Sequence, residues 1–139
     1  MGTMSDAERD AFLSETRYAI LTTLRRDGSP VSVPVWFDWD GEAVRMFTHE
    51  VTPKIRRVRN DAHASVLVAN RIDEKEKWVA FDGDISVHDK GGMALAEKLA
   101  ARYWEDTPDH AAALDSWRQM ESGWRLLELR PAAIRTYVD

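Results

Sequence analysis

The sequence predicts an α+β protein whose antiparallel strands close, or nearly close, into a barrel. Two pairs, Asp27-Gly28 and Asp40-Gly41, separate three runs that are rich in β-forming residues. Asp-Gly accepts the positive φ angles that tight hairpin turns require, so consecutive antiparallel strands follow. Five to seven such strands in a chain of 139 residues would leave exposed edges, and closure of the sheet is the economical way to protect them.

Local chemistry places the individual elements. Ser5 and Glu8 form a capping box that begins a first helix, and Thr52 followed by Pro53 suits the N-cap and first position of a second. Apolar residues at helical spacing predict a third helix, and a Thr-Pro pair opens a fourth. The expected helices are 5–14, 52–59, 93–104 and 107–121, and the expected strands are about 18–25, 30–38, 42–48, 63–70, 77–88, 124–131 and 133–139.

Composition limits the class of protein. The length favours a single domain over residues 1–139. The absence of cysteine excludes disulfides and thiolate chemistry and favours the cytoplasm. No apolar run approaches the ~20 residues that cross a membrane. The 24 acidic residues outnumber the 19 basic ones, which counts against a general nucleic-acid binder.

Several common catalytic sites are not predicted. The four histidines are not spaced as a helical metal pair, so no metal site is expected. The chain has no G-x-S-x-G motif and neither of the glycine-rich loops that hold nucleotide phosphates. A serine hydrolase and a standard nucleotide-binding loop are therefore not expected.

One stretch departs from the acidic character of the chain. Residues 51–60 contain one lysine and three arginines and no acid. Thr48 is expected to end a strand, and Thr52 and Lys54 to open a helix, whose first N–H groups and dipole favour an anion. Two hydroxyls and an ammonium at that point predict a phosphate site, which Arg56 and Arg57 would reinforce from the same helical turns. The alternative is that these residues form a solvated basic helix face.

A second candidate lies one hairpin earlier, in the run SVPVWFDW. Its aromatic residues, Trp36, Phe37 and Trp39, belong either to a packed strand and turn or to a platform for a flat ring. Pro34 cannot donate a ladder hydrogen bond, so this strand is expected at an edge where a ligand can reach backbone groups. A ring platform one strand away from a phosphate site is what FMN requires.

The order of these stretches matches a known family. They are Thr23-Leu24 with Asp27-Gly28 and Pro30, the run Pro34-Val35-Trp36-Phe37, the strand-ending Thr48, Lys54-Ile55-Arg56, and Asn60-Asp61. On these residues the chain, over about 16–90, resembles the pyridoxamine 5′-phosphate oxidase-like split β-barrel superfamily, which includes FMN-binding proteins and reductases that use the deazaflavin F420. The resemblance implies an antiparallel split β-barrel of six to seven strands with peripheral helices.

The resemblance also implies a site. Thr48 and Thr52 would hydrogen-bond the cofactor phosphate, Lys54 would neutralise it, and a homodimer would complete the pocket with Trp78 or Trp124 of the second subunit. The implied cofactor-binding residues are Val31, Ser32, Val33, Pro34, Val35, Thr48, Thr52, Pro53, Lys54, Arg57 and Trp78.

The chain departs from the family pattern in places. Many relatives carry an arginine one or two positions before the lysine, where this chain has Pro53 and Thr52, and Arg57 replaces the usual asparagine. The missing arginine weakens the expected phosphate site. The Arg-rich C-terminal motif of true pyridoxamine phosphate oxidases is absent, so pyridoxamine oxidation is not expected.

The expected function is an oxidoreductase that uses FMN, or alternatively F420, and transfers hydride or electrons to or from a small organic substrate. Such a transfer needs no protein acid or base, so no catalytic residue is assigned. Three alternatives remain: a flavin or F420 carrier without a substrate of its own, a heme-handling barrel with His49 or His63 as axial ligand, and an anion- or nucleic-acid-binding module. The net charge of −5 counts against the last.

Overall fold

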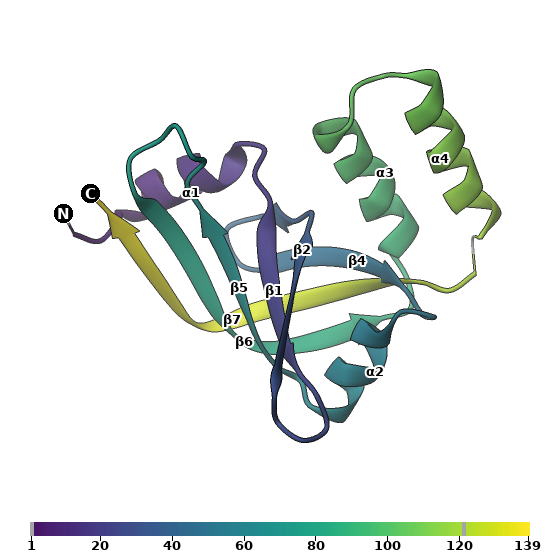
Figure 1. Cartoon of the computed structure of the whole chain (residues 1–139), viewed down its shortest axis with the longest axis horizontal. Coiled ribbons are helices and arrows are strands. Elements are labelled where there is room, and N and C mark those ends of the chain that lie inside the picture. Colours follow the sequence, from purple (N-terminus) through teal and green to yellow (C-terminus); the bar gives the residue numbers. More distant parts are fainter. Residues whose placement is uncertain (1, 121) are drawn as a thin grey trace.

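A computed structural model describes residues 2–120 and 122–139 and contains seven strands and four helices (Figure 1). The strands form one sheet in the order β2-β1-β5-β6-β7-β4-β3, in which every neighbouring pair is antiparallel. The predicted α+β split barrel is thereby confirmed. The elements are α1 Asp6–Ser14, β1 Ala19–Leu24, β2 Pro30–Val35, β3 Asp38–Trp39, β4 Val44–His49, α2 Pro53–Asn60, β5 His63–Ala69, β6 Lys77–His88, α3 Gly92–Tyr103, α4 Pro108–Gln119 and β7 Trp124–Val138.

Both predicted Asp-Gly turns are present. Gly28 and Gly41 have φ angles of 86° and 96°, values that glycine adopts without steric cost. The first turn joins β1 to β2 and the second joins β3 to β4. The capping box of Ser5 and Glu8 is also formed at the start of α1. The hairpins and this helix therefore follow from local chemistry.

The predicted strand over 30–38 is interrupted at Trp36 and Phe37. The cause lies on α3, where the Tyr103 hydroxyl accepts the Phe37 N–H at 3.3 Å and Arg102 donates to the Phe37 carbonyl at 3.2 Å. These side chains satisfy backbone groups that a continuous strand would have paired. Phe37, at 1% exposure, fills the core, whereas Trp36 packs against the rings of Tyr103 and Trp104.

The C-terminal strand also differs from expectation. The two predicted runs, 124–131 and 133–139, are one strand, β7, which pairs with β4 at its start and with β6 along most of its length. The pairing with β6 shifts between Asp82 and Gly83, so that Ala132 is the additional residue of a bulge. Pro131 is tolerated beside this bulge, where the ladder is already disrupted. The predicted end of the fourth helix, near residue 121, lies outside the described residues.

The barrel interior is apolar and the helices are placed around it. Residues at alternate positions of β1, β4, β5 and β6 form the core with Phe12, Leu13, Phe37, Ile55 and Val58. The last two anchor α2, since they are the buried residues of that helix. Figure 1 shows α2 at one end of the β1–β2 hairpin and the α3–α4 pair projecting from the other side of the sheet. No helix in the described parts of the chain is long and apolar enough to span a membrane.

Candidate functional site

Two threonine hydroxyls meet where β4 passes into α2. Thr48 Oγ1 lies 2.8 Å from Thr52 Oγ1, and Thr48 is only 5% exposed. Thr52 occupies the predicted N-cap position, but its side chain makes no cap bond because it faces Thr48 instead. With Pro53 at the first helical position, the N-terminus of α2 has no side-chain cap. Its leading N–H groups and its dipole therefore remain free to attract an anion.

Unpaired cations surround this helix start. Among the described residues, no acidic side chain lies within ion-pair distance of five basic side chains on α2 and the neighbouring hairpin, whereas Arg59 pairs with Glu50. Every arginine elsewhere in the chain has an acidic partner. These basic side chains therefore differ from the other arginines in lacking an ion-pair partner among the described residues, although Glu50 lines the groove beside them. The five side chains, here called the cation group, are Arg25, Arg26, Lys54, Arg56 and Arg57.

Two members of the cation group are partly withdrawn from water. Burial, and then the neighbouring charge of Arg57, lowers the pKa of Lys54 below its usual range. Burial, and then the charges of Arg25 and Arg56, lowers the pKa of Arg57. Both shifts mean that the charged forms are less stable here than in water. A bound anion would relieve this cost.

Strand β2 offers a free edge, as the prolines predicted. It is the first strand of the sheet and pairs only with β1. Pro30 and Pro34 cannot donate to β1, so they mark the positions whose backbone groups point to the free edge. Ser32 shares their alternation and is the sole residue of this trio with an N–H. The free edge therefore presents one donor, Ser32 N–H, between carbonyl acceptors.

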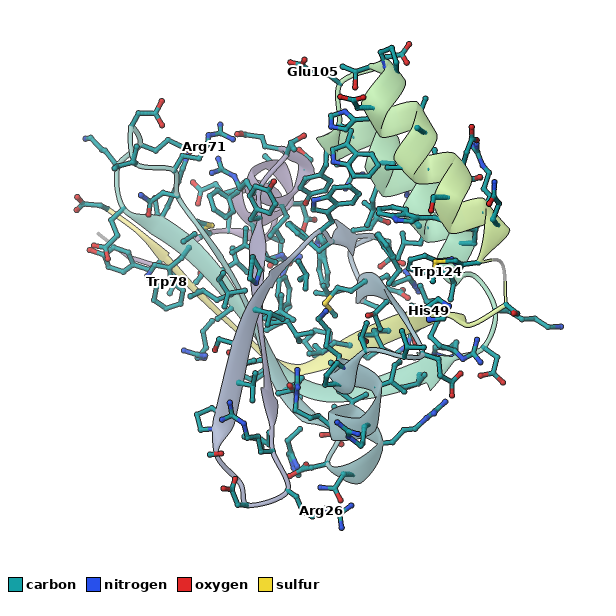
Figure 2. All side chains as sticks on the ribbon, turned by 45° about the vertical axis from the view of Figure 1, so that its right-hand side comes forward. Arg26, His49, Arg71, Trp78, Glu105 and Trp124 are labelled. Atoms are coloured by element: carbon teal, nitrogen blue, oxygen red, sulfur yellow. The ribbon has the colours of Figure 1, made fainter. Side chains whose placement is uncertain are left out.

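The two halves of the expected site do not share one cavity. A groove of about 490 Å3 is lined by Thr52, Pro53 and Arg56, together with Arg26, Arg59 and the acidic Glu50, but by no residue of β2 and by neither Lys54 nor Arg57. Figure 2 places Arg26 at the tip of the β1–β2 hairpin, beside α2. Val31, Val33 and Val35 are half-buried, and Ser32 and Pro34 are exposed. The groove thus adjoins the expected phosphate residues and shares only Thr52 and Pro53 with them, while the ring end has only the strand edge.

A cluster of six rings lies beyond the end of β2, and the sequence did not predict it. Trp36 stacks on Tyr103 with centroids 5.0 Å apart and planes 6° apart. The contacts continue through Trp104, Trp117, Phe47 and Trp124. Trp36 therefore serves to hold the α3–α4 pair on the barrel. Of the other two residues of the predicted ring platform, Phe37 belongs to the core, and Trp39 packs on Phe81 and donates to Asp10. Both therefore agree with the alternative prediction, a packed strand and turn.

Trp78 is far from the phosphate end within one chain. Figure 2 shows Trp78 on one side of the molecule and His49 and Trp124 on the other. Trp78 stacks on Tyr137 at 6.2 Å and lines a shallow cavity of about 360 Å3 with Leu67 and Ala80, on the face of the sheet that points away from the core. Trp124 is 9% exposed and packs on Phe47 and His49, so its contacts lie inside the chain.

The two histidines named as possible heme ligands are already engaged. Val51 N–H donates to His49 Nδ1 at 3.3 Å, and His49 Nε2 faces the Ser122 carbonyl at 3.2 Å. Both ring nitrogens of His49 are therefore used. His49 is therefore not placed as an axial ligand. His63 bonds Asp61 through Nδ1 at 2.7 Å, and the hydrogen bond and charge of Asp61 raise the pKa of His63.

Comparison with protein families gives one match that spans nearly the whole chain. The model described as pyridoxamine 5′-phosphate oxidase matches residues 5–137. No curated protein sequence matches the chain.

Solved structures share the fold at low sequence identity. A protein described as an F420 reductase is 24% identical, with a TM-score of 0.70 over 90% of this chain and 94% of its own. A FAD-binding protein from Mesorhizobium loti is 18% identical, with a TM-score of 0.66 over 97% and 93% of the two chains. The heme storage protein HutZ from Vibrio cholerae is 17% identical, with a TM-score of 0.66 over 92% and 91%. Proteins with this fold thus include ones described as an F420 reductase, a FAD-binding protein and a heme storage protein.

Proposed function

The chain belongs to the pyridoxamine 5′-phosphate oxidase family, and from this premise we propose that it binds FMN and acts as a cytoplasmic oxidoreductase on a small organic substrate. The cofactor phosphate lies at Thr48, Thr52 and Lys54, with Arg57 beside it. The flat ring lies along the free edge of β2, over residues 31–35. The cofactor supplies the hydride or electron transfer, and the protein binds and orients it.

The observation that carries this proposal is the cation group around an uncapped helix start. Lys54 and Arg57 are partly buried without an acidic partner among the described residues, and both have lowered pKa values. Partly buried charges are normally paired, because desolvation is costly. A phosphate supplies the missing negative charge and accepts hydrogen bonds from the hydroxyls and the helix N–H groups. The residues present therefore fit a phosphorylated cofactor.

The free edge of β2 fits the polar side of a flavin ring. There, one ring N–H lies between two carbonyl acceptors. The β2 edge offers the complementary groups, Ser32 N–H and the carbonyls of Ser32 and Pro34, since the Pro30 carbonyl accepts from Arg25 at 3.2 Å; the two prolines also discourage another strand from pairing there. Backbone donors beside the ring can stabilise negative charge on the reduced cofactor.

FMN is preferred to F420 because the hydroxyl pair, Lys54 and the helix start form a compact site for one terminal phosphate. The observation that favours F420 as the alternative is the adjoining groove, which Arg26, Arg56 and Arg59 line next to Thr52. Basic side chains beyond the phosphate could receive an anionic tail. A direct comparison of the two cofactors decides between them.

A homodimer completes the ring end in this proposal. Apolar side chains are exposed on the outward face of the sheet, among them Ile20 and Leu67 at 38% each, and Trp78 and Tyr137 lie on the same face. Exposed apolar side chains of this kind beside polar ones, here Thr22, Ser65 and Arg135, are typical of a protein interface. Four of the six tryptophans pack on one another within the chain, so the support comes from this face and from Trp78, and less from the number of tryptophans.

The test begins with the absorption spectrum of the purified protein and continues with titration of the cofactor-free protein with FMN and with F420, followed by fluorescence. Lys54→Ala should weaken binding by roughly ten- to a hundredfold, since a charged hydrogen bond contributes about 1.5–3 kcal/mol. For FMN, Arg59→Ala is the matched control on the same helix, because Arg59 already pairs with Glu50; it is not a control for F420, because Arg59 lines the adjoining groove. Affinities weaker than about 100 μM for both cofactors, or a Lys54→Ala protein that binds as tightly as the wild type, would refute the proposal. Tight binding without reduction of any substrate indicates a carrier, and a Soret band indicates heme.

A further inference from the structure

We propose that Thr23 positions Arg57 as the second cation of the phosphate site, and that the pair makes the site selective for a dianionic terminal phosphate. This inference rests on the proposed function. It adds the charge state of the ligand and a positioning residue, Thr23, which does not itself contact the ligand. It also compensates for the arginine that many relatives carry before the lysine and this chain lacks, because Arg57 supplies a cation that Thr52 and Pro53 do not.

The side chain of Arg57 is held by a buried partner. Its Nε donates to Thr23 Oγ1 at 2.9 Å, and Thr23 on β1 is 1% exposed. Nε is one of five N–H donors on the planar guanidinium, so the bond fixes the plane and leaves the two terminal nitrogens for a ligand. The Arg57 side chain makes no other hydrogen bond or ion pair to a described residue. A planar fork that is fixed in this way is suited to two oxygens of one phosphate.

Lys54 and Arg57 act on the same ligand because of their spacing. They are three residues apart on α2, so they lie on neighbouring positions of one helix face. The charge of Arg57 contributes to the lowered pKa of Lys54, which shows that the two cations are close enough to repel each other. The helix itself cannot turn away, since Ile55 and Val58 anchor it in the core.

The charge of this arrangement matches a phosphate monoester better than a diester. A terminal phosphate monoester has its second pKa near 6 and carries about −1.5 to −2 at pH 7, whereas a diester carries −1. A dianion neutralises both Lys54 and Arg57, and a monoanion leaves one of them uncompensated in a partly buried place. The dianion should therefore gain affinity from both cations.

The test compares three ligands on cofactor-free protein: FMN, the monoanionic cyclic ester riboflavin 4′,5′-cyclic phosphate, and riboflavin, which has no phosphate. Thr23→Val should weaken FMN binding roughly three- to tenfold, because the guanidinium loses its fixed orientation. Riboflavin binding should not change, and the preference for FMN over the cyclic ester should shrink. Thr136→Val is the matched control, since Thr136 on β7 bonds only Met4 N–H through its hydroxyl among the described residues. Thr23→Ser, which keeps the hydroxyl, should retain the affinity for FMN.

A second variant keeps the inference testable if Thr23→Val does not fold. Arg57→Gln should lower the affinity for FMN at least tenfold, spare riboflavin, and flatten the rise in FMN affinity between pH 5 and pH 7 that follows the second ionisation of the phosphate. In an Arg57→Gln background, Thr23→Val should have no further effect. Equal losses for FMN and riboflavin, or unchanged FMN binding in either variant, would overturn the inference alone. A wild type that binds none of the three flavins would overturn the proposed function as well.

Discussion

The hydroxyl pair at the start of α2 allows a sharp prediction about which threonine contacts the ligand. Thr48 Oγ1 and Thr52 Oγ1 are 2.8 Å apart, and one hydroxyl hydrogen must lie between them, so the pair has one hydrogen left to donate. Thr48 is 5% exposed, whereas Thr52 stands at the more accessible helix start. We therefore predict that Thr48 donates to Thr52 and that Thr52 donates to the phosphate.

The magnitudes of two isosteric substitutions follow from this order. Thr52→Val removes a hydrogen bond to a charged group, worth about 1.5–3 kcal/mol, and should weaken FMN binding roughly ten- to a hundredfold. Thr48→Val removes only a neutral bond of about 0.5–1.5 kcal/mol that orients Thr52, and should cost roughly two- to tenfold. Thr52→Ser keeps the donor and should bind nearly as well as the wild type.

The assay is quenching of flavin fluorescence on titration with protein, with riboflavin as the ligand that lacks the phosphate. Neither valine variant should alter riboflavin affinity, and thermal unfolding checks that both proteins are folded. A larger loss of FMN affinity in Thr48→Val than in Thr52→Val would show that the buried threonine is the direct donor. Equal losses of FMN affinity and riboflavin affinity would show that the threonine pair supports the fold and does not contact the phosphate.

Three further predictions concern protonation, assembly and stability. FMN affinity should fall as pH rises and the ammonium of Lys54 is lost, at a pH below the usual range for lysine, because burial and a neighbouring guanidinium lower its pKa; titrations from pH 7 to 10 should show the fall in wild type and not in Lys54→Met. Leu67→Glu, which places a charge on the outward sheet face, should convert a dimer into a monomer in light scattering, and Ile72→Glu, in an exposed loop, should not; a monomeric wild type at micromolar concentration would contradict the assembly. Arg17→Met should lower the free energy of unfolding by about 3 kcal/mol, because it breaks a buried ion-pair network. The control Arg118→Met, on the surface, should lower it by less than about 1 kcal/mol. Equal losses of the two variants in denaturant melts would refute this difference.

The sequence predicts those parts of the fold that neighbouring residues determine. Asp-Gly turns, the Ser5–Glu8 capping box and the proline at the start of α2 act within a few residues, and β6 agrees with its predicted bounds, 77–88. The edge position of β2 was also predictable, because Pro30 and Pro34 exclude a central strand. These signals need no knowledge of what the chain meets later.

Contacts between distant residues explain what the sequence could not predict. The interruption of the strand after Val35 depends on Arg102 and Tyr103, which lie more than 60 residues later in the sequence. No residue of the run PVWF predicts it. The bond from Arg57 to Thr23 joins a helix to a strand 34 residues earlier. The run of basic residues was visible in the sequence, whereas the absence of acidic partners for most of it, among the described residues, could be recognised only from the ion pairs of the structure.

The arrangement of α2 links binding to stability. Ile55 and Val58 hold the helix in the core, and the same anchorage forces Lys54 and Arg57 to remain partly buried and close together, at a cost that their lowered pKa values record. The protein without ligand therefore keeps an unfavourable charge arrangement that the fold imposes. A phosphate removes that cost only in the folded state, since an unfolded chain solvates both cations. Ligand binding and folding thus favour each other: at a ligand concentration of 100 times Kd, the folded state gains about 2.7 kcal/mol. In the proposed site, the unfavourable charge of Lys54 and Arg57 in the free protein would thus be the source of the affinity for a phosphate.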